Sequence, residues 1–224
     1  MLTNCDVYKI SCESCQYISE WSVLNIQNIR RIEISSFFTG MALSPAPNTQ
    51  YRDKCLKQIK TLNIEIDRWR TVLKSGMKTL GRISELKREK SGQRDKDNPT
   101  HTTIAIASTS HDELLQMQDL CVELSYNCRD LKEVCENLDR IAERLECLAK
   151  LDVELTEVAN AAQVISKCYR KQWAMNQAVA KNVAKCDCEH SLVLHSAVWI
   201  HQPGLDSQCT VAEIIVEHFL DILS

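Results

Sequence analysis

The sequence predicts an all-α fold in which long coiled-coil helices form an antiparallel helical hairpin or bundle, joined by a disordered linker and followed by a C-terminal helical segment. Helix-breaking residues are few, with 5 Gly and 4 Pro among 224 residues. Apolar residues recur at alternating steps of three and four along two long segments, which is the spacing of one helix face. The opposite faces of these segments are charged, as expected for helices that bury one side.

The first predicted helix covers residues 51–90, after an N-terminal extension (1–50) that shows no regular pattern and is expected to be poorly structured. Within the extension, Trp21–Ile34 is compatible with a short helix or a strand. The 51–90 helix carries an apolar stripe of Ile59, Leu62, Ile66, Trp69, Leu73, Leu80 and Ile83. Gly76 takes one apolar place in the stripe, and marks either a weak point or a close approach of another group.

Residues 91–111 are predicted to be a flexible linker, because this stretch has no large apolar cluster to bury. A capping box formed by Ser110 and Glu113 then opens a long coiled-coil helix over 112–185. Its first apolar phase is Leu114, Met117, Cys121, Leu124, Cys128, Leu131, Cys135, Leu138, Ala142 and Leu145. The phase changes afterwards, which predicts a bend or a break near 146–155. Such a seam needs a covering partner, either the 51–90 helix folding back or another chain.

The remaining residues, 186–224, are predicted to form a C-terminal helical segment. Lys185–His190 is expected to be a turn, followed by helices over Ser191–Ile200 and Thr210–Leu223. Trp199 to Pro203 (WIHQP) is interpreted as an anchor for a partner. A Trp side chain buries a large area at low entropic cost, which suits an interface. The alternative is that Trp199 packs inside the protein against its own helices, and the sequence leaves both readings open.

No motif for catalysis, phosphate binding or metal binding stands out, so the sequence predicts a protein that is not an enzyme and has no cofactor. Cys121, Cys128 and Cys135 share one heptad position and are interpreted as packing residues. Cys12 and Cys15 lack a second pair at zinc-finger spacing. The cluster of Cys186, Cys188, His190 and His195 matches no common zinc motif and is interpreted as a surface turn.

Charge and hydropathy narrow the expected partners and location. The formal net charge of −3 gives no basic field for nucleic acid, so no direct nucleic-acid binding is expected. No apolar run is long enough for a bilayer, so no membrane is expected. We see no secretory signal, and the 12 cysteines are therefore expected to be reduced thiols in the cytosol or nucleus.

Several segments resemble the cyclin-dependent kinase 2-interacting protein (CINP) family. The resemblance rests on Tyr169-Arg170-Lys171, on Val179–Ala184, and most specifically on Trp199–Pro203. The helix with Trp69 and Gly76, and the Leu120–Leu124 run, are similar too, so that roughly residues 52–90 and 112–205 are covered. The family's proline-bearing interruption between its two helical halves has no counterpart in Leu148–Lys167, and residues 1–50 have none either.

The resemblance implies a non-catalytic nuclear adaptor, possible also in the cytoplasm, that acts in the cell cycle, DNA replication, DNA-damage checkpoints and repair, and ribosome biogenesis. The implied partners are a cyclin-dependent kinase, a Cdc7-type kinase, a checkpoint kinase complex, and an AAA-type ATPase with a second coiled-coil subunit. The alternative is a self-associating structural coiled coil without these partners. The expected partner-binding residues are Trp69, Leu124, Leu131, Leu138, Tyr169, Arg170, Lys171, Trp199, His201, Gln202 and Pro203.

Overall fold

The computed structural model describes residues 49–94, 111–186 and 188–224, and within them all regular structure is helical, which confirms the all-α prediction. The elements are α3 (Thr49–Arg94), α4 (His111–Ala149), the 3₁₀ turn η1 (Val153–Leu155), α5 (Thr156–Asn182), the 3₁₀ turn η2 (Val183–Lys185), α6 (Glu189–His201) and α7 (Ser207–Leu223). The expectations for residues 1–48, Trp21–Ile34 among them, and for the linker at 95–110 lie outside the described residues.

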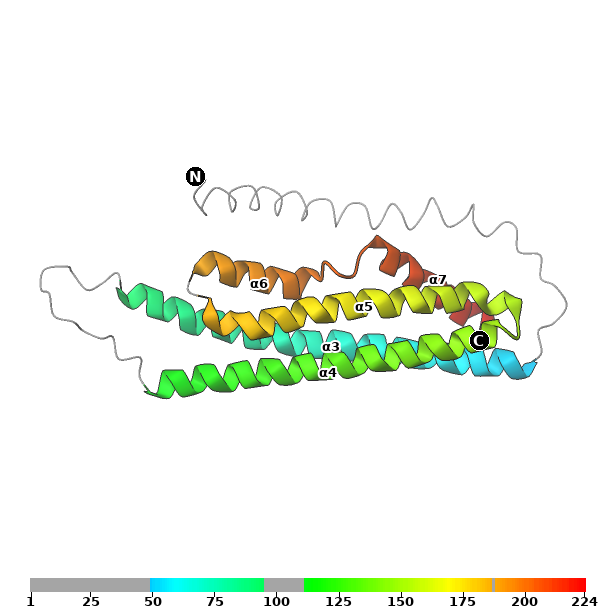
Figure 1. Ribbon diagram of the computed structural model, residues 1–224, viewed down its shortest axis with the longest axis horizontal. Helices are drawn as coiled ribbons and strands as arrows, with labels where there is room; N and C mark the ends of the chain where they lie inside the picture. Colours follow the sequence, from blue (N-terminus) through cyan, green and yellow to red (C-terminus); the bar gives the residue numbers. More distant parts are fainter. Residues whose placement is uncertain (1–48, 95–110, 187) are drawn as a thin grey trace, which may run out of the picture. The chain divides into compact units, whose positions relative to one another are not determined.

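Helix α3 carries the apolar stripe that the sequence predicts, and every member of that stripe is buried. The helix continues to Arg94, so it includes the first residues of the segment predicted to be a linker. It runs antiparallel to α4 (Figure 1). Two polar contacts join α3 to α4: Arg68 forms an ion pair with Glu133 at 2.8 Å, and the Thr79 hydroxyl donates a hydrogen bond to Glu123 at 2.8 Å.

The predicted helix over 112–185 is interrupted where a bend or a break was expected, and the interruption is a break, because the chain reverses direction between α4 and α5. Helix α4 ends at Ala149, and the Asp152 side chain accepts a hydrogen bond from the Glu154 backbone N–H to start η1. Leu151 and Val153 are 63% and 81% exposed, so the apolar stripe is interrupted at this turn. The two apolar phases therefore belong to two antiparallel helices, α4 and α5, that face one core (Figure 1).

Helices α6 and α7 together form the fourth side of this bundle. Both pack on α3 and on α5, end to end, while α4 occupies the side opposite them. The turn predicted at Lys185–His190 becomes η2 and the start of α6, and the two C-terminal helices lie close to their predicted ranges. The fourth side is broken at Gln202–Asp206, between α6 and α7. The Trp199–Pro203 motif, the most specific part of the resemblance, runs from the end of α6 into this break.

Candidate partner-binding site

The three leucines expected to bind a partner through the α4 seam are enclosed by the chain itself. Leu124, Leu131 and Leu138 have no exposed surface. Helices α3 and α5 cover the seam from two sides, so the folding-back alternative accounts for its burial. The expectation that these side chains present a surface to another protein is therefore wrong for the folded chain, since the bundle already satisfies the apolar stripe.

Trp199 lies in the core, between α6 and α3. Its side chain has no exposed surface, and its indole N–H donates a hydrogen bond to the backbone oxygen of Leu73 at 3.1 Å. A Cβ built on Gly76 would lie 2.3 Å from the Trp199 ring. Gly76 is thus a site of close approach, which explains why the α3 stripe has a glycine there. Of the two readings of Trp199, the structure favours the one in which it packs against its own helices.

Gln202 ends α6 and ties the break to α3. Its φ of 47° lies in the left-handed region, the usual conformation for a residue that stops a helix. The Gln202 side-chain oxygen accepts a hydrogen bond from the Trp69 indole at 2.8 Å. The Trp69 and Tyr169 rings meet edge to face, with centroids 4.9 Å apart. Trp69, Tyr169 and Gln202, all expected to bind a partner, contact one another inside the protein.

Gln172 and Asn176 on α5 form a polar centre that the sequence reading missed. Both side chains are fully buried. The Gln172 side-chain oxygen accepts from the Gly204 backbone N–H at 2.7 Å, and its amide donates to Asn176 at 2.8 Å and to the Val198 carbonyl at 3.2 Å. A Cβ on Gly204 would lie 2.7 Å from the Gln172 backbone. The sequence does indicate that Gln172 and Asn176 are buried, because both continue the three-and-four spacing of Ile165 and Tyr169.

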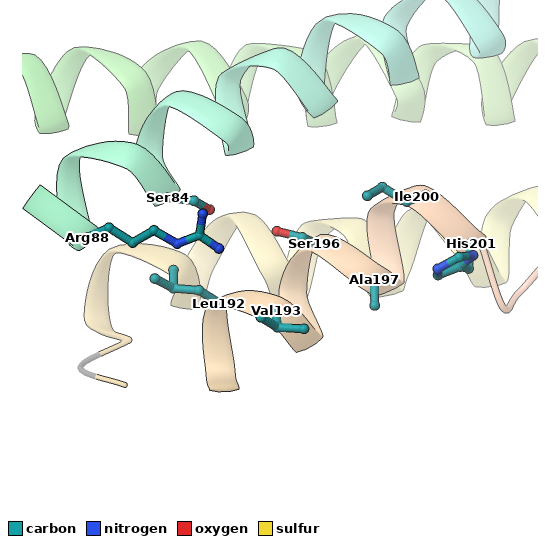
Figure 2. A pocket seen from close by; sticks show the side chains of 8 residues that line it. All are labelled: Ser84, Arg88, Leu192, Val193, Ser196, Ala197, Ile200 and His201. Carbon is teal, nitrogen blue, oxygen red and sulfur yellow. The ribbon is translucent and has the colours of Figure 1, made fainter. Parts of the chain in front are cut away.

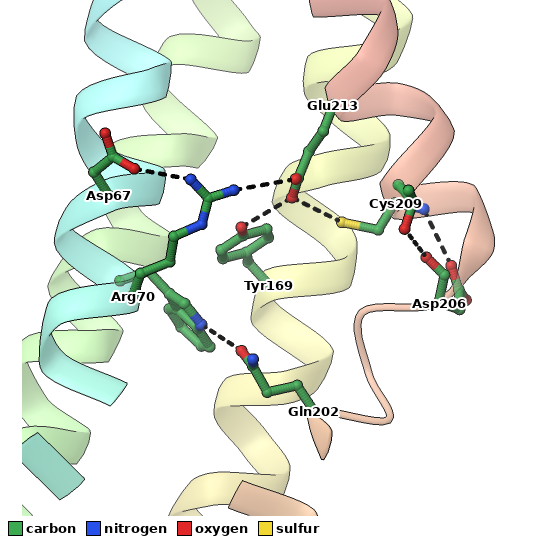
Figure 3. A network of polar contacts seen from close by, with 9 residues as sticks. Asp67, Arg70, Tyr169, Gln202, Asp206, Cys209 and Glu213 are labelled. Atoms are coloured by element: carbon green, nitrogen blue, oxygen red, sulfur yellow. Dashed lines mark hydrogen bonds and ion pairs between the residues drawn. The ribbon is translucent and has the colours of Figure 1, made fainter. Parts of the chain in front are cut away.

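An ionic network lies on the other side of the same break, between α3, α5 and α7 (Figure 3). The Tyr169 hydroxyl donates to Glu213 at 3.0 Å, and Arg70 reaches the same carboxylate at 3.6 Å while also pairing with Asp67 at 2.8 Å. Burial, with the adjacent Glu213 carboxylate, raises the pKa of Tyr169 well above its usual value. Tyr169 is therefore a neutral structural donor at physiological pH. We define these contacts, with those of Trp199, Gln202 and Gln172, as the clasp.

The other predicted partner-binding residues lie at the surface. His201 and Pro203 are exposed beside the clasp, and Arg170 and Lys171 are exposed on α5. Arg170 forms an ion pair with Asp139 of α4, which also accepts from Ser166. The expected partner-binding residues thus divide into two groups: buried residues that hold α6 in place, and exposed residues that remain accessible.

The cysteines behave as packing residues where they are buried. Burial raises the pKa of the Cys128 and Cys135 thiols to about 12, so both stay protonated and unreactive at neutral pH. Cys186 lies 3.4 Å from His195, while the Cys188 thiol contacts the Ser191 hydroxyl at 3.1 Å. Among the residues that the structure describes, no group of three or more possible ligands is arranged to hold a metal ion. Cys12 and Cys15 lie outside those residues.

The outer face of α6 is an accessible apolar surface. This helix is apolar on all sides: one side, with Leu192 and Trp199, is buried, whereas Val193, Leu194 and Ile200 are 55%, 48% and 47% exposed. A helix that is apolar all round is normally covered on all sides. Beside this face, a groove of about 250 Å³ runs between α6 and α3 (Figure 2), lined by Ser84, Arg88, Leu192, Val193, Ser196, Ala197, Ile200 and His201.

Small side chains line part of the groove. Its α3 side is formed by Ser84 and Arg88. Small residues on both sides, such as Ser84 and Ala197, permit close approach of a backbone. Arg88 and His201 are the basic side chains that line the groove. We define the outer face of α6 together with this groove as the α6 surface.

Comparison with known proteins does not assign the chain to a family. In the described residues, none of the helices is both long and apolar enough to span a bilayer. A scan against protein-family models gives no match to the chain, and a search of curated proteins gives no match either.

Proposed function

We propose that the protein is a non-catalytic adaptor that binds a larger assembly through the α6 surface, while the clasp holds that surface in place. The observation that carries the proposal is the exposed apolar side of α6, with Val193, Leu194 and Ile200 half exposed beside an open groove. Exposed apolar patches of this kind mark protein-interaction sites. Coiled-coil packing of the long helices belongs to the same proposal, because their apolar spacing is that of heptads.

The occupant that best fits the α6 surface is an amphipathic helix of a protein partner. An amphipathic helix lays its apolar face into a groove between two helices. Val193 and Ile200 offer apolar contacts to such a face. The resemblance to CINP-like proteins suggests the identity of the partner: the second coiled-coil subunit of an AAA-type ATPase assembly. Cell-cycle and checkpoint kinases, in the nucleus, are the further partners that the resemblance suggests.

A matched pair of variants in cells tests the proposal. Val193→Asp places a charge on the α6 surface, whereas Val153→Asp makes the same change at the α4–α5 turn, where Val153 is 81% exposed. Affinity purification of the tagged full-length chain followed by mass spectrometry should recover a stable complex with wild type and with Val153→Asp. Val193→Asp should lose one set of partners, because an unpaired charge would be buried in the interface.

Two outcomes would contradict this function. Recovery of the same partners in the same amounts with Val193→Asp would exclude the α6 surface as the site. Recovery of no stable partner by any of the three proteins would exclude the adaptor role. Circular dichroism of the purified variants provides the folding control, since both substituted side chains are exposed in the isolated chain.

A further inference from the structure

The outer face of α4, directly opposite its buried side, carries a second heptad pattern. The residues are Leu115, Asp119, Val122, Tyr126 and Arg129, spaced four, three, four and three apart. All five are exposed, and Leu115, Val122 and Tyr126 are 45%, 45% and 54% exposed. Apolar residues at this spacing are typical of a coiled-coil seam rather than of a solvated face. We define these five residues as the outer stripe.

Contacts within the described chain leave the outer stripe open. The Arg129 guanidinium lies over the Tyr126 ring, 4.9 Å from its centroid, and pairs loosely with its neighbour Asp130 at 3.8 Å. Within the described residues, Asp119 makes no ion pair. The stripe therefore combines three apolar side chains with one acidic and one basic group. Both charged groups are available to a second surface.

The order of these residues makes the outer stripe complementary to itself in one orientation. If two copies cross antiparallel with a two-fold axis near Leu124, Val122 of each copy faces Tyr126 of the other, and Asp119 faces Arg129. A parallel pair would instead place Asp119 against Asp119 and Arg129 against Arg129, which is repulsive. The antiparallel arrangement gives two apolar contacts at the centre and an ion pair at each end.

We propose that the outer stripe is a homodimer interface that binds a second copy of this chain in antiparallel orientation. The occupant is a second copy because the acidic and basic groups of one stripe match those of a second stripe across such a two-fold axis. The interface is short and belongs to the small class that gives weak, reversible association. The stripe lies on the side of the bundle opposite α6 and α7, so a dimer leaves the α6 surface accessible. Self-association thus adds to the proposed adaptor role and does not depend on it.

Sedimentation velocity of the purified full-length chain, over loading concentrations from low micromolar to near millimolar, tests the proposal. Wild type should show a concentration-dependent monomer–dimer equilibrium. Asp119→Arg and Arg129→Asp should each weaken the dimer at least about tenfold, since each places like charges opposite one another. The double variant D119R/R129D should restore it, because the ion pairs re-form with reversed polarity. Asp53→Arg, the same charge change at an exposed position of α3, is the matched control and should dimerise like wild type.

Each other result would overturn the proposal. A monomer at every concentration would show that the outer stripe does not pair. A dimer that survives both single variants, or that Asp53→Arg weakens equally, would place the interface elsewhere. Failure of the double variant to regain the dimer, with its helical circular dichroism intact, would exclude the antiparallel orientation.

Discussion

Alanine at Gly76 should destabilise the protein, although alanine in a helix normally stabilises it. The added Cβ would lie 2.3 Å from Cζ2 and 2.6 Å from Cε2 of Trp199, so the indole must move. That ring is fully buried and is held by its hydrogen bond to Leu73. Gly81, five residues further along α3, is the matched control, because its Cβ would meet nothing within 4 Å.

Two opposing terms set the magnitude. Replacing glycine with alanine inside a helix raises the free energy of unfolding by about 1 kcal/mol, and Gly81→Ala should gain up to this amount. Gly76→Ala gains the same but displaces a packed aromatic ring, and overpacking of this kind costs about 1–3 kcal/mol. Because the ring is anchored at both its face and its N–H, we expect a cost near the upper end. The net loss should then be about 1–2 kcal/mol.

Urea denaturation followed by circular dichroism measures both variants, which should change stability in opposite directions. In a Trp199→Ala background the obstacle is gone, so Gly76→Ala should become neutral or stabilising, as a double-mutant cycle would show. If Gly76→Ala instead stabilises the otherwise wild-type protein as much as Gly81→Ala, then the Trp199 ring does not lie against Gly76, and this contact of the clasp does not exist.

Two further predictions concern the polar centre and the buried thiols. Gln172→Ala should lower the free energy of unfolding by about 2–4 kcal/mol, because it leaves a cavity and the unpaired N–H of Gly204; a loss below about 0.5 kcal/mol in the same denaturation assay would contradict this. The folded-state pKa of Cys128 and Cys135 is raised from 9.0 to about 12, so their contribution to stability is complete below about pH 9 and is lost as the pH rises toward 12. Denaturation measured across that range should show stability falling with pH, and Cys128→Val with Cys135→Val should flatten the decline; an unchanged slope would mean that these thiols are not buried.

Apolar spacing predicted which faces are buried but not which element covers them. The stripe of α3 and the helical segments after 186 follow from local periodicity and turn residues. A heptad seam looks the same in sequence whether its partner is another chain or a later helix of the same chain. The phase change before Leu155 indicated an interruption, but neither Pro nor Gly marks the reversal there, so it was interpreted as a bend or a break.

The motif that contributes to the clasp was found in the sequence, which left open whether Trp199 faces a partner or packs inside the protein. Trp, Tyr and Gln at Trp199, Tyr169 and Gln202 suit an interface and a buried polar contact equally well. Their assignment depends on Gly76 and Gln172, which approach them only in the folded chain. The polar Gln172 and Asn176 at core positions were the available sign, since buried amides need specific partners. The identity of those partners lies in residues far along the chain, which periodicity does not reveal.

Hydrogen–deuterium exchange of the isolated monomer, read by mass spectrometry, tests most directly whether the chain covers its own seam. The account predicts strong protection in the centre of α4 around Leu131 and in α6 around Trp199, at a dilution where neither a partner nor a dimer is present. Adding the cellular partner should then slow exchange mainly at Val193–Ile200. Rapid exchange around Leu131 in the monomer, with protection gained only when another protein is added, would contradict it.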